Sequence, residues 1–163
     1  FNYLAGEHVT GLEAGRPLFV RTPSSDFTLA NFMRTHLFAS LASLRVGMDV
    51  LLRDEGVELD SMFAHGGLFK TKGVAQGFLA AAMDSPVSVG EVAGEGGAWG
   101  MALLAAFLDA GEVSLTDWLQ GEVFADAEIE TAEPNPADVE GFNTYMERYR
   151  AGLAIERAAV EAI

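Results

Sequence analysis

One stretch of the chain, from Ser61 to Ala106, most constrains the fold that the sequence can adopt. A short apolar segment ends in a Gly-Gly pair, Gly66 and Gly67, and a helical pattern follows it. A second apolar segment then leads into a second glycine-rich turn, Ala93–Gly100, and a second helical pattern. Strand–turn–helix units present backbone N–H groups to an anion or a nucleotide. The stretch therefore predicts an α/β fold with a ligand site at its glycine turns.

Hydrophobic periodicity predicts the other elements. Apolar residues spaced by three and four predict a long helix that begins after Ser24 or Ser25, which would cap it, and ends near Gly56. We further expect strands over Val57–Ala64 and Pro86–Gly90. Helices are expected over Gly73–Met83, which Thr71 would cap, and over Ala98–Asp109, which would be buried. Two more helices are expected to begin at Ser114 and at Pro136 or Asp138. Residues 1–25 are expected to be irregular and residues 130–141 to be an acidic loop. In the last helix, Tyr145 and Tyr149 are expected to be partly exposed.

Composition and charge exclude several classes of protein. The sequence has no cysteine, so it has neither disulfides nor thiolate metal sites. Its net charge of −14 arises between Lys72 and Arg148, a window without Lys or Arg that holds fourteen acids. We interpret this window as solvated surface, with a cation site or a basic partner as alternatives. Nucleic-acid binding is not expected because no basic stripe is present. The absence of a membrane-spanning run and of a signal peptide favours a cytoplasmic protein.

The segment GGLFKTKG must be compared with known phosphate-binding motifs. A P-loop needs glycine directly before Lys-Ser/Thr, but here Phe69 precedes Lys70 and Thr71. The dinucleotide fingerprint Gly-x-Gly-x-x-Gly is also absent. Two residues without Cβ still allow a ring or a ribose to lie close against the backbone. Bases are nearly absent around the turn, since Lys70 and Lys72 are the only nearby positive charges in the sequence. A seat for adenosine is therefore favoured over a phosphate cradle, and the second glycine turn, around Glu95, is expected to be the packing that holds this seat.

Other polar residues give weaker signals. We expect Glu95 to have a structural hydrogen-bonding role, because no second acid or histidine lies at a partnering distance in the sequence. Glu7 and His8 are interpreted as polar surface rather than as metal ligands, and no metal site is predicted. Arg34 and His36 lie on the polar side of the long helix and are not expected to be catalytic.

The order of these motifs resembles the C-terminal domain of the FGGY carbohydrate kinases, which have the ribonuclease-H/actin-like ATPase fold. In that family a strand ends in Gly-Gly, the adenosine motif, and a helix follows. A strand led by Pro-Val comes next, and then a Glu-x-x-Ala-x-Gly-x-Ala turn into a small-residue helix. Here these features fall on Gly66-Gly67, Pro86-Val87 and Glu95–Ala102. The helix before the adenosine motif matches Phe27–Arg53, with Thr35 and Phe38 departing from the usual residues. The resemblance covers about residues 1–110.

The resemblance implies a nucleotide site on this chain. Gly66 and Gly67 would line the adenine or ribose of ATP, together with Leu68, Lys70 and Thr71. Relatives carry Asn or Ser at the position of Thr71, and Lys70 would either reach a phosphate or face solvent. The family's catalytic aspartate and phosphate loops belong to a part of the fold upstream of Phe1. The resemblance therefore implies no catalytic residue in this fragment, and Mg²⁺ bound mainly through the missing lobe.

The expected protein is the C-terminal lobe of a sugar kinase, a partial domain with a mixed sheet flanked by helices. Residues 1–110 would form its core, and residues 112–163 an acidic loop and terminal helices. The whole protein would transfer the γ-phosphoryl group of ATP to a sugar hydroxyl, with a ketopentose such as xylulose or ribulose as first choice. The N-terminal lobe and a second copy of the chain are the expected protein partners. The alternatives are a non-catalytic domain of the same fold with a role in assembly or regulation, and a generic α/β domain whose Gly-Gly turn is only a turn.

Overall fold

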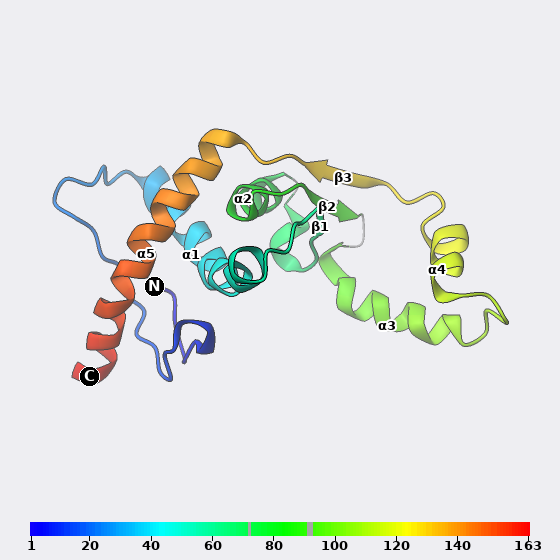
Figure 1. The fold of residues 1–163 in the computed structure, drawn as a ribbon, viewed down its shortest axis with the longest axis horizontal. Coiled ribbons are helices and arrows are strands. Elements are labelled where there is room, and N and C mark those ends of the chain that lie inside the picture. The colour runs from blue at the N-terminus through cyan, green and yellow to red at the C-terminus, as the bar shows by residue number, and fades with distance from the viewer. Residues whose placement is uncertain (72, 91–92) are drawn as a thin grey trace. The chain divides into compact units, whose positions relative to one another are not determined.

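The structure is a computed structural model that describes residues 1–71, 73–90 and 93–163. Its helices are α1 (Leu29–Asp49), α2 (Val74–Met83), α3 (Gly96–Phe107), α4 (Leu115–Trp118) and α5 (Pro136–Ala162), and its strands are β1 (Met62–Phe63), β2 (Val87–Gly90) and β3 (Ile129–Ala132) (Figure 1). Single 3-10 turns cover His8–Thr10, Gly67–Lys70 and Ala93–Glu95, and π-helical turns cover Val50–Asp54 and Leu119–Val123. The chain divides into two compact units: residues 1–59, 81–84 and 134–163, and residues 60–80 and 85–133.

The second unit contains a mixed sheet in the order β1-β2-β3. β1 pairs in parallel with β2, in the register Met62 to Val87, and α2 connects the two strands. β2 pairs antiparallel with β3, in the register Gly90 to Ile129. This agrees with the mixed α/β architecture expected from the sequence. β1 is shorter than the predicted strand 57–64, because only Met62 and Phe63 have pairing partners on β2.

β3 corrects the prediction of an acidic loop over residues 130–141. Its side chains are almost all exposed, so no buried apolar residue marks it as a strand. The strand is held instead by its backbone pairing with β2 and by a contact of 2.8 Å between the hydroxyl oxygens of Ser88 and Thr131. Residues 136–141 belong to α5, which begins at Pro136 as the sequence predicts. Asn135 caps it by accepting from the backbone N–H groups of Ala137 and Asp138.

α2 closely matches the helix predicted over Gly73–Met83. Residues 79–83 of α2 are all buried. At its start Val74 is 48% exposed, whereas Ala75 is buried. The turn between α2 and β2 passes through Asp84 in a left-handed conformation (φ 51°).

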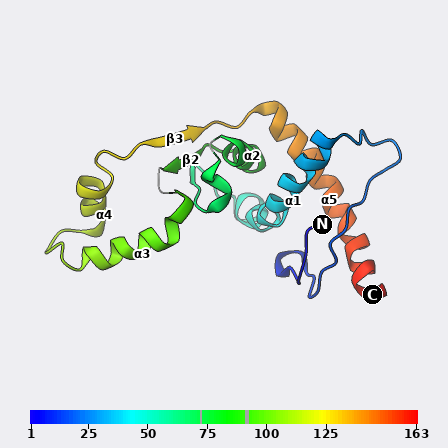
Figure 2. The ribbon, with the colours of Figure 1, turned by 180° about the vertical axis from the view of Figure 1, so that it is seen from behind.

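In the first unit, α1 and α5 lie against each other (Figures 1 and 2). The ring of Phe38 packs at 5.1 Å from that of Phe142 and at 5.2 Å from that of Tyr145. Phe142 and Met146 are fully buried. Tyr145 is half-buried, as predicted, but the prediction for Tyr149 is wrong, since only 4% of it is exposed. The cause is the N-terminal segment, whose Phe1 and Tyr3 cover the Tyr149 ring.

The ends of α1 correct one prediction and confirm another. The N-cap is Thr28, whose hydroxyl accepts from the backbone N–H of Asn31 at 3.1 Å, and neither Ser24 nor Ser25 has this role. At the other end Gly56 adopts the left-handed conformation (φ 64°) that stops the helical segment. The π-helical turn between α1 and Gly56 lengthens the segment to 26 residues, Leu29–Asp54.

By length and composition alone, this segment is able to cross a membrane, with a mean hydropathy of 1.2. Core helices of soluble proteins pass the same test. Here the helix carries the buried Arg45, whose Nε donates to Asp49 at 2.9 Å, and its aromatic face packs on α5. These contacts cover one face of the helix, and 28% of its most apolar window is buried.

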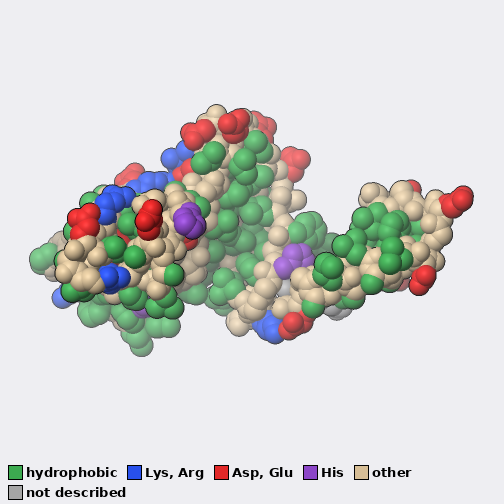
Figure 3. Space-filling model, turned by 90° about the horizontal axis from the view of Figure 1, so that it is seen from below, with side chains coloured by type: hydrophobic (Ala, Val, Ile, Leu, Met, Phe, Trp, Pro, Cys, Tyr) green, Lys and Arg blue, Asp and Glu red, His purple; other side chains and the backbone are tan. Residues whose placement is uncertain are grey.

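α3 differs most from its prediction. The sequence is apolar nearly all round, which predicts a buried helix, yet none of its residues is buried. Met101 is 68% exposed, and Leu108, just after the helix, is 84% exposed. Trp99 contacts Phe124, and Phe107 contacts Trp118, so the π-helical turn and α4 cover it only in part. Figure 3 shows hydrophobic side chains gathered over this segment, at the right of the view. The described residues of this unit place nothing over the remaining apolar surface of α3.

Candidate functional site

The Gly66-Gly67 turn connects β1 to α2 and is open to solvent. Gly66 has φ 117° and ψ 170°, a backbone conformation that residues other than glycine rarely adopt. Gly67 begins the 3-10 turn, which the backbone N–H of Phe69 closes by donating to the carbonyl of Gly66 at 3.0 Å. A Cβ added to either glycine would meet no atom within 4 Å. The turn therefore presents bare backbone to open space, as a flat ligand seat requires.

The second glycine turn packs directly against the first. The ammonium nitrogen of Lys70 donates to Glu95 Oε1 at 2.8 Å. A Cβ on Gly94 would lie 2.6 Å from Cε of Lys70, and a Cβ on Gly96 would lie 2.5 Å from Nδ1 of His65. Two glycines of the second turn thus leave the space that side chains of the first turn occupy. The two turns form one structure, although 25 residues separate Lys70 from Glu95.

The ion pair settles where Lys70 points in this structure. Both partners are largely exposed, with 58% of the Lys70 side chain and 72% of the Glu95 side chain accessible. The hydrogen bond from Lys70, with the attraction of its charge, holds the pKa of the Glu95 carboxyl below its ordinary value. Glu95 thus has the hydrogen-bonding role that the sequence suggests. Lys70 was expected either to reach a phosphate or to face solvent. In the structure its side chain is 58% exposed and its ammonium group contacts the carboxylate of Glu95.

The remaining predicted residues lie beside the turn. Leu68 is 45% exposed and Thr71 is exposed, so both are accessible to a ligand. α2 begins at Val74, and the N–H of Gly77 donates to the carbonyl of Gly73, so Gly73 is at the N-cap position and Thr71 lies two residues before it. The prediction that Thr71 caps this helix therefore fails. Lys72, the other nearby base, lies outside the described residues.

The sequence favours the second glycine turn as the packing that holds the seat, but it assigns no individual contact to His65, Gly94 or Gly96. His65 directly precedes the Gly-Gly pair, and its ring fills the space beside Gly96. A signal for this contact exists in the sequence, because glycines on both sides of Glu95 are costly unless close packing requires them. Which side chains they accommodate cannot be read from the sequence, since the contact joins two distant turns.

The polar residues of the first unit for which the sequence predicts no catalytic or metal-binding role make local contacts. Glu7 accepts from the backbone N–H of Val9 at 3.3 Å and so caps the turn that contains His8. The ring of His36 packs against Phe32 at 4.6 Å, and Arg34 pairs with Asp138 at 3.6 Å. Among the residues described, no three His, Cys, Asp or Glu side chains are grouped so that they could hold a metal ion.

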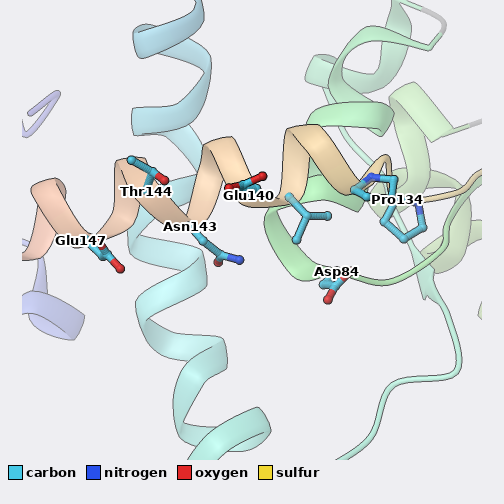
Figure 4. Close-up of a pocket in the computed structure, with 8 residues that line it drawn as sticks. Asp84, Pro134, Glu140, Asn143, Thr144 and Glu147 are labelled. Carbon is cyan, nitrogen blue, oxygen red and sulfur yellow. The ribbon is translucent and has the colours of Figure 1, made fainter.

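A shallow pocket lies elsewhere, in the first unit, with a volume of about 470 Å³. Figure 4 shows Glu140, Asn143 and Glu147 projecting from α5, and Asp84 from the turn after α2. The pocket also contains Pro134, Pro136, Val139 and Thr144. Its three carboxylates disfavour a phosphate ligand, and none of the residues predicted to bind ATP lines it.

Comparison with known proteins identifies a family. Residues 1–108 match the model of the FGGY family of carbohydrate kinases, C-terminal domain. The match includes both glycine turns, α1 and all of α3, and it ends before α4. No curated protein matches the chain.

Proposed function

The chain belongs to the FGGY family of carbohydrate kinases, and we propose on this basis that it supplies the adenosine-binding side of the ATP site of a sugar kinase. The proposed seat is the Gly66-Gly67 turn, bordered by Leu68, Lys70 and Thr71. The observation that carries the proposal is the open space over both glycines, at the end of a strand, within the matched region.

The geometry of the turn fits an adenosine better than a phosphate. The glycines expose peptide planes on which a ring or a ribose can lie, with no Cβ in the way. The nearest described cation, the Lys70 ammonium, is already neutralised by Glu95. A phosphate would have to compete with this carboxylate, whereas a neutral ring or ribose does not disturb the pair.

Carbohydrate kinases transfer the γ-phosphoryl group of ATP to a sugar hydroxyl, with Mg²⁺ offsetting the phosphate charge. The residues of this chain would bind and orient the adenosine end of the nucleotide. We propose that the catalytic base, the phosphate loops and the main Mg²⁺ ligands belong to another lobe of the same protein. This chain would then be inactive alone, because positioning of both substrates needs closure of two lobes.

Several finer assignments are part of the proposal. We propose a ketopentose, xylulose or ribulose, as the sugar, which makes the protein similar to xylulokinases. We also propose a cytoplasmic location and association with the N-terminal lobe, with a homodimer as a further assembly. A domain of actin-like fold that has lost catalysis and acts in assembly or regulation is the competing function.

Nucleotide affinity tests the proposal most directly. In the full-length protein we expect ATP to bind, and the substitution Gly67→Asp to weaken binding by at least tenfold as measured by calorimetry. The new side chain would project into open space, so folding should be retained. It would occupy the adenosine seat and place a carboxylate there.

Gly121→Asp is the matched control, because a Cβ at Gly121 also meets no atom within 4 Å. Gly121 is exposed in the π-helical turn after α4, outside the matched region. This variant should bind ATP like the wild type. A wild-type protein without nucleotide affinity would contradict the kinase proposal and favour the non-catalytic alternative. Wild-type ATP binding without phosphorylation of any ketopentose would reject only the sugar assignment.

A further inference from the structure

We propose that Gly96 and Gly94 are positioning residues for the adenosine seat, acting through His65 and Lys70 without contacting the nucleotide. The inference rests on the proposed function, since it assigns a support to the same seat. It follows from the packing of the two glycine turns, in which side chains that flank Gly66-Gly67 occupy the space left by the second turn.

The contact at Gly96 is the tighter of the two. A Cβ there would lie 2.5, 2.7 and 2.9 Å from Nδ1, Cγ and Cβ of His65. Rotation of the His65 side chain about its Cα–Cβ bond can move the first two atoms away. It cannot move Cβ, which is attached to the backbone next to Gly66. A side chain at position 96 must therefore push the His65-Gly66 backbone and the start of α3 apart, which shifts the seat relative to its support.

The contact at Gly94 acts through the ion pair. A Cβ there would lie 2.6 Å from Cε and 3.0 Å from Cγ of Lys70. The lysine chain is flexible enough to move aside, so the backbone need not shift. Its ammonium group would then leave Glu95, and the salt bridge that joins the turns would be lost. We expect a milder effect at Gly94 than at Gly96.

The neighbouring Gly97 offers a matched comparison. It lies in the same first turn of α3, is exposed, and a Cβ there would meet no atom within 4 Å. Neither Gly96 nor Gly97 has a positive φ, so alanine fits the backbone conformation of both. The variants Gly96→Ala and Gly97→Ala therefore have the same helix propensity change and differ in the contact with His65.

The experiment measures ATP affinity of both variants in the full-length protein by calorimetry. Gly96→Ala should raise the dissociation constant about tenfold, the scale expected when a positioned group shifts by a fraction of an ångström. Gly97→Ala should leave it unchanged. His65→Gly removes all three clashing atoms, so the double variant His65→Gly/Gly96→Ala should bind ATP as well as His65→Gly alone. A general loss of stability would not be rescued in this way.

Amide hydrogen exchange of residues 68–71 supplies a second readout that needs no nucleotide. Exchange should accelerate in Gly96→Ala and not in Gly97→Ala. Equal affinity and equal exchange in the two variants would overturn the positioning role while leaving the proposed ATP site standing. If the wild type bound no ATP, the proposed function would fail. The exchange comparison would then decide whether the second turn holds the first, and unchanged exchange in Gly96→Ala would refute that as well.

Discussion

The side-chain amide of Gln76, in α2, donates to the backbone carbonyl of Glu130, in β3, across 2.8 Å. The same nitrogen donates to the carbonyl of Val87, in β2, also at 2.8 Å. Gln76 is 4% exposed, so it makes both hydrogen bonds from a buried position. One polar side chain therefore ties the helix that follows the Gly-Gly turn to two neighbouring strands of the sheet.

Replacement of Gln76 by methionine should destabilise the protein. Methionine keeps the length of the side chain but removes both hydrogen bonds. We expect a loss of about 1–3 kcal/mol in the free energy of unfolding, measured by urea denaturation. Gln120→Met is the control, because Gln120 is exposed in the turn after α4. A loss at Gln76 no larger than that at Gln120 would contradict the structural role.

Local signals in the sequence predicted much of the fold. Pro136 begins α5, Gly56 stops the segment that begins with α1, and the Gly-Gly pair follows a strand, because these residues act through their own backbone conformation. Such preferences do not depend on distant parts of the chain. The order of the motifs also carries the family resemblance, which the match over residues 1–108 bears out.

The features that the sequence did not predict depend on contacts between distant residues. β3 is a strand because β2 lies beside it, and Tyr149 is buried because the N-terminal segment covers it. Lys70 pairs with Glu95 across 25 residues, and no local pattern specifies that pairing. α3 was expected to be buried from its composition, but composition does not show which surface covers a helix. The glycines of the sequence located the candidate ligand seat and the turn that supports it, whereas the side-chain contacts between the two turns were not predicted.

Asp49 joins α1 to α5 and provides a second test. Its Oδ1 accepts from Nε of Arg45 at 2.9 Å and from Nε of Arg53 at 3.2 Å, and its Oδ2 pairs with Arg150. Asp49→Asn would leave the buried Arg45 without its carboxylate, at a cost of about 3 kcal/mol in unfolding free energy. Thermal and urea denaturation measure the effect. The exposed Asp54→Asn is the control, and an equal loss in both variants would refute the bridging role.

The tyrosines of α5 predict a loss of stability in alkali. Burial raises the pKa of Tyr145 above its ordinary value, and burial together with the hydrogen bond to Tyr3 raises that of Tyr149 further. A raised pKa means that the folded protein keeps protons that the unfolded chain releases. The stabilisation is complete below the unfolded pKa of about 10 and is lost as the pH rises above it.

Ultraviolet absorbance of tyrosinate measures this directly. On slow titration, Tyr145 and Tyr149 should ionise together with loss of helical circular dichroism, because ionisation requires unfolding. Above pH 10, the slope of the unfolding free energy against pH reports how many protons are released on unfolding, and in Tyr149→Phe this number should be smaller by about one. Ionisation of Tyr145 and Tyr149 near pH 10 with the fold intact would show that they are not buried as described.

The last prediction concerns the ion pair beside the candidate seat. Because Lys70 lowers the pKa of the Glu95 carboxyl, Lys70→Met should raise that pKa toward its ordinary value. A lowered pKa means that the pair contributes stability above the unfolded pKa of Glu95 and loses it as the pH falls through the folded value. A carbon-detected NMR titration of Glu95 measures the shift. Arg157→Met, which removes an exposed charge from α5, should leave the Glu95 titration unchanged. An identical titration of Glu95 in the wild type and Lys70→Met would mean that the pair does not persist in solution, and that Lys70 is free to contact a nucleotide.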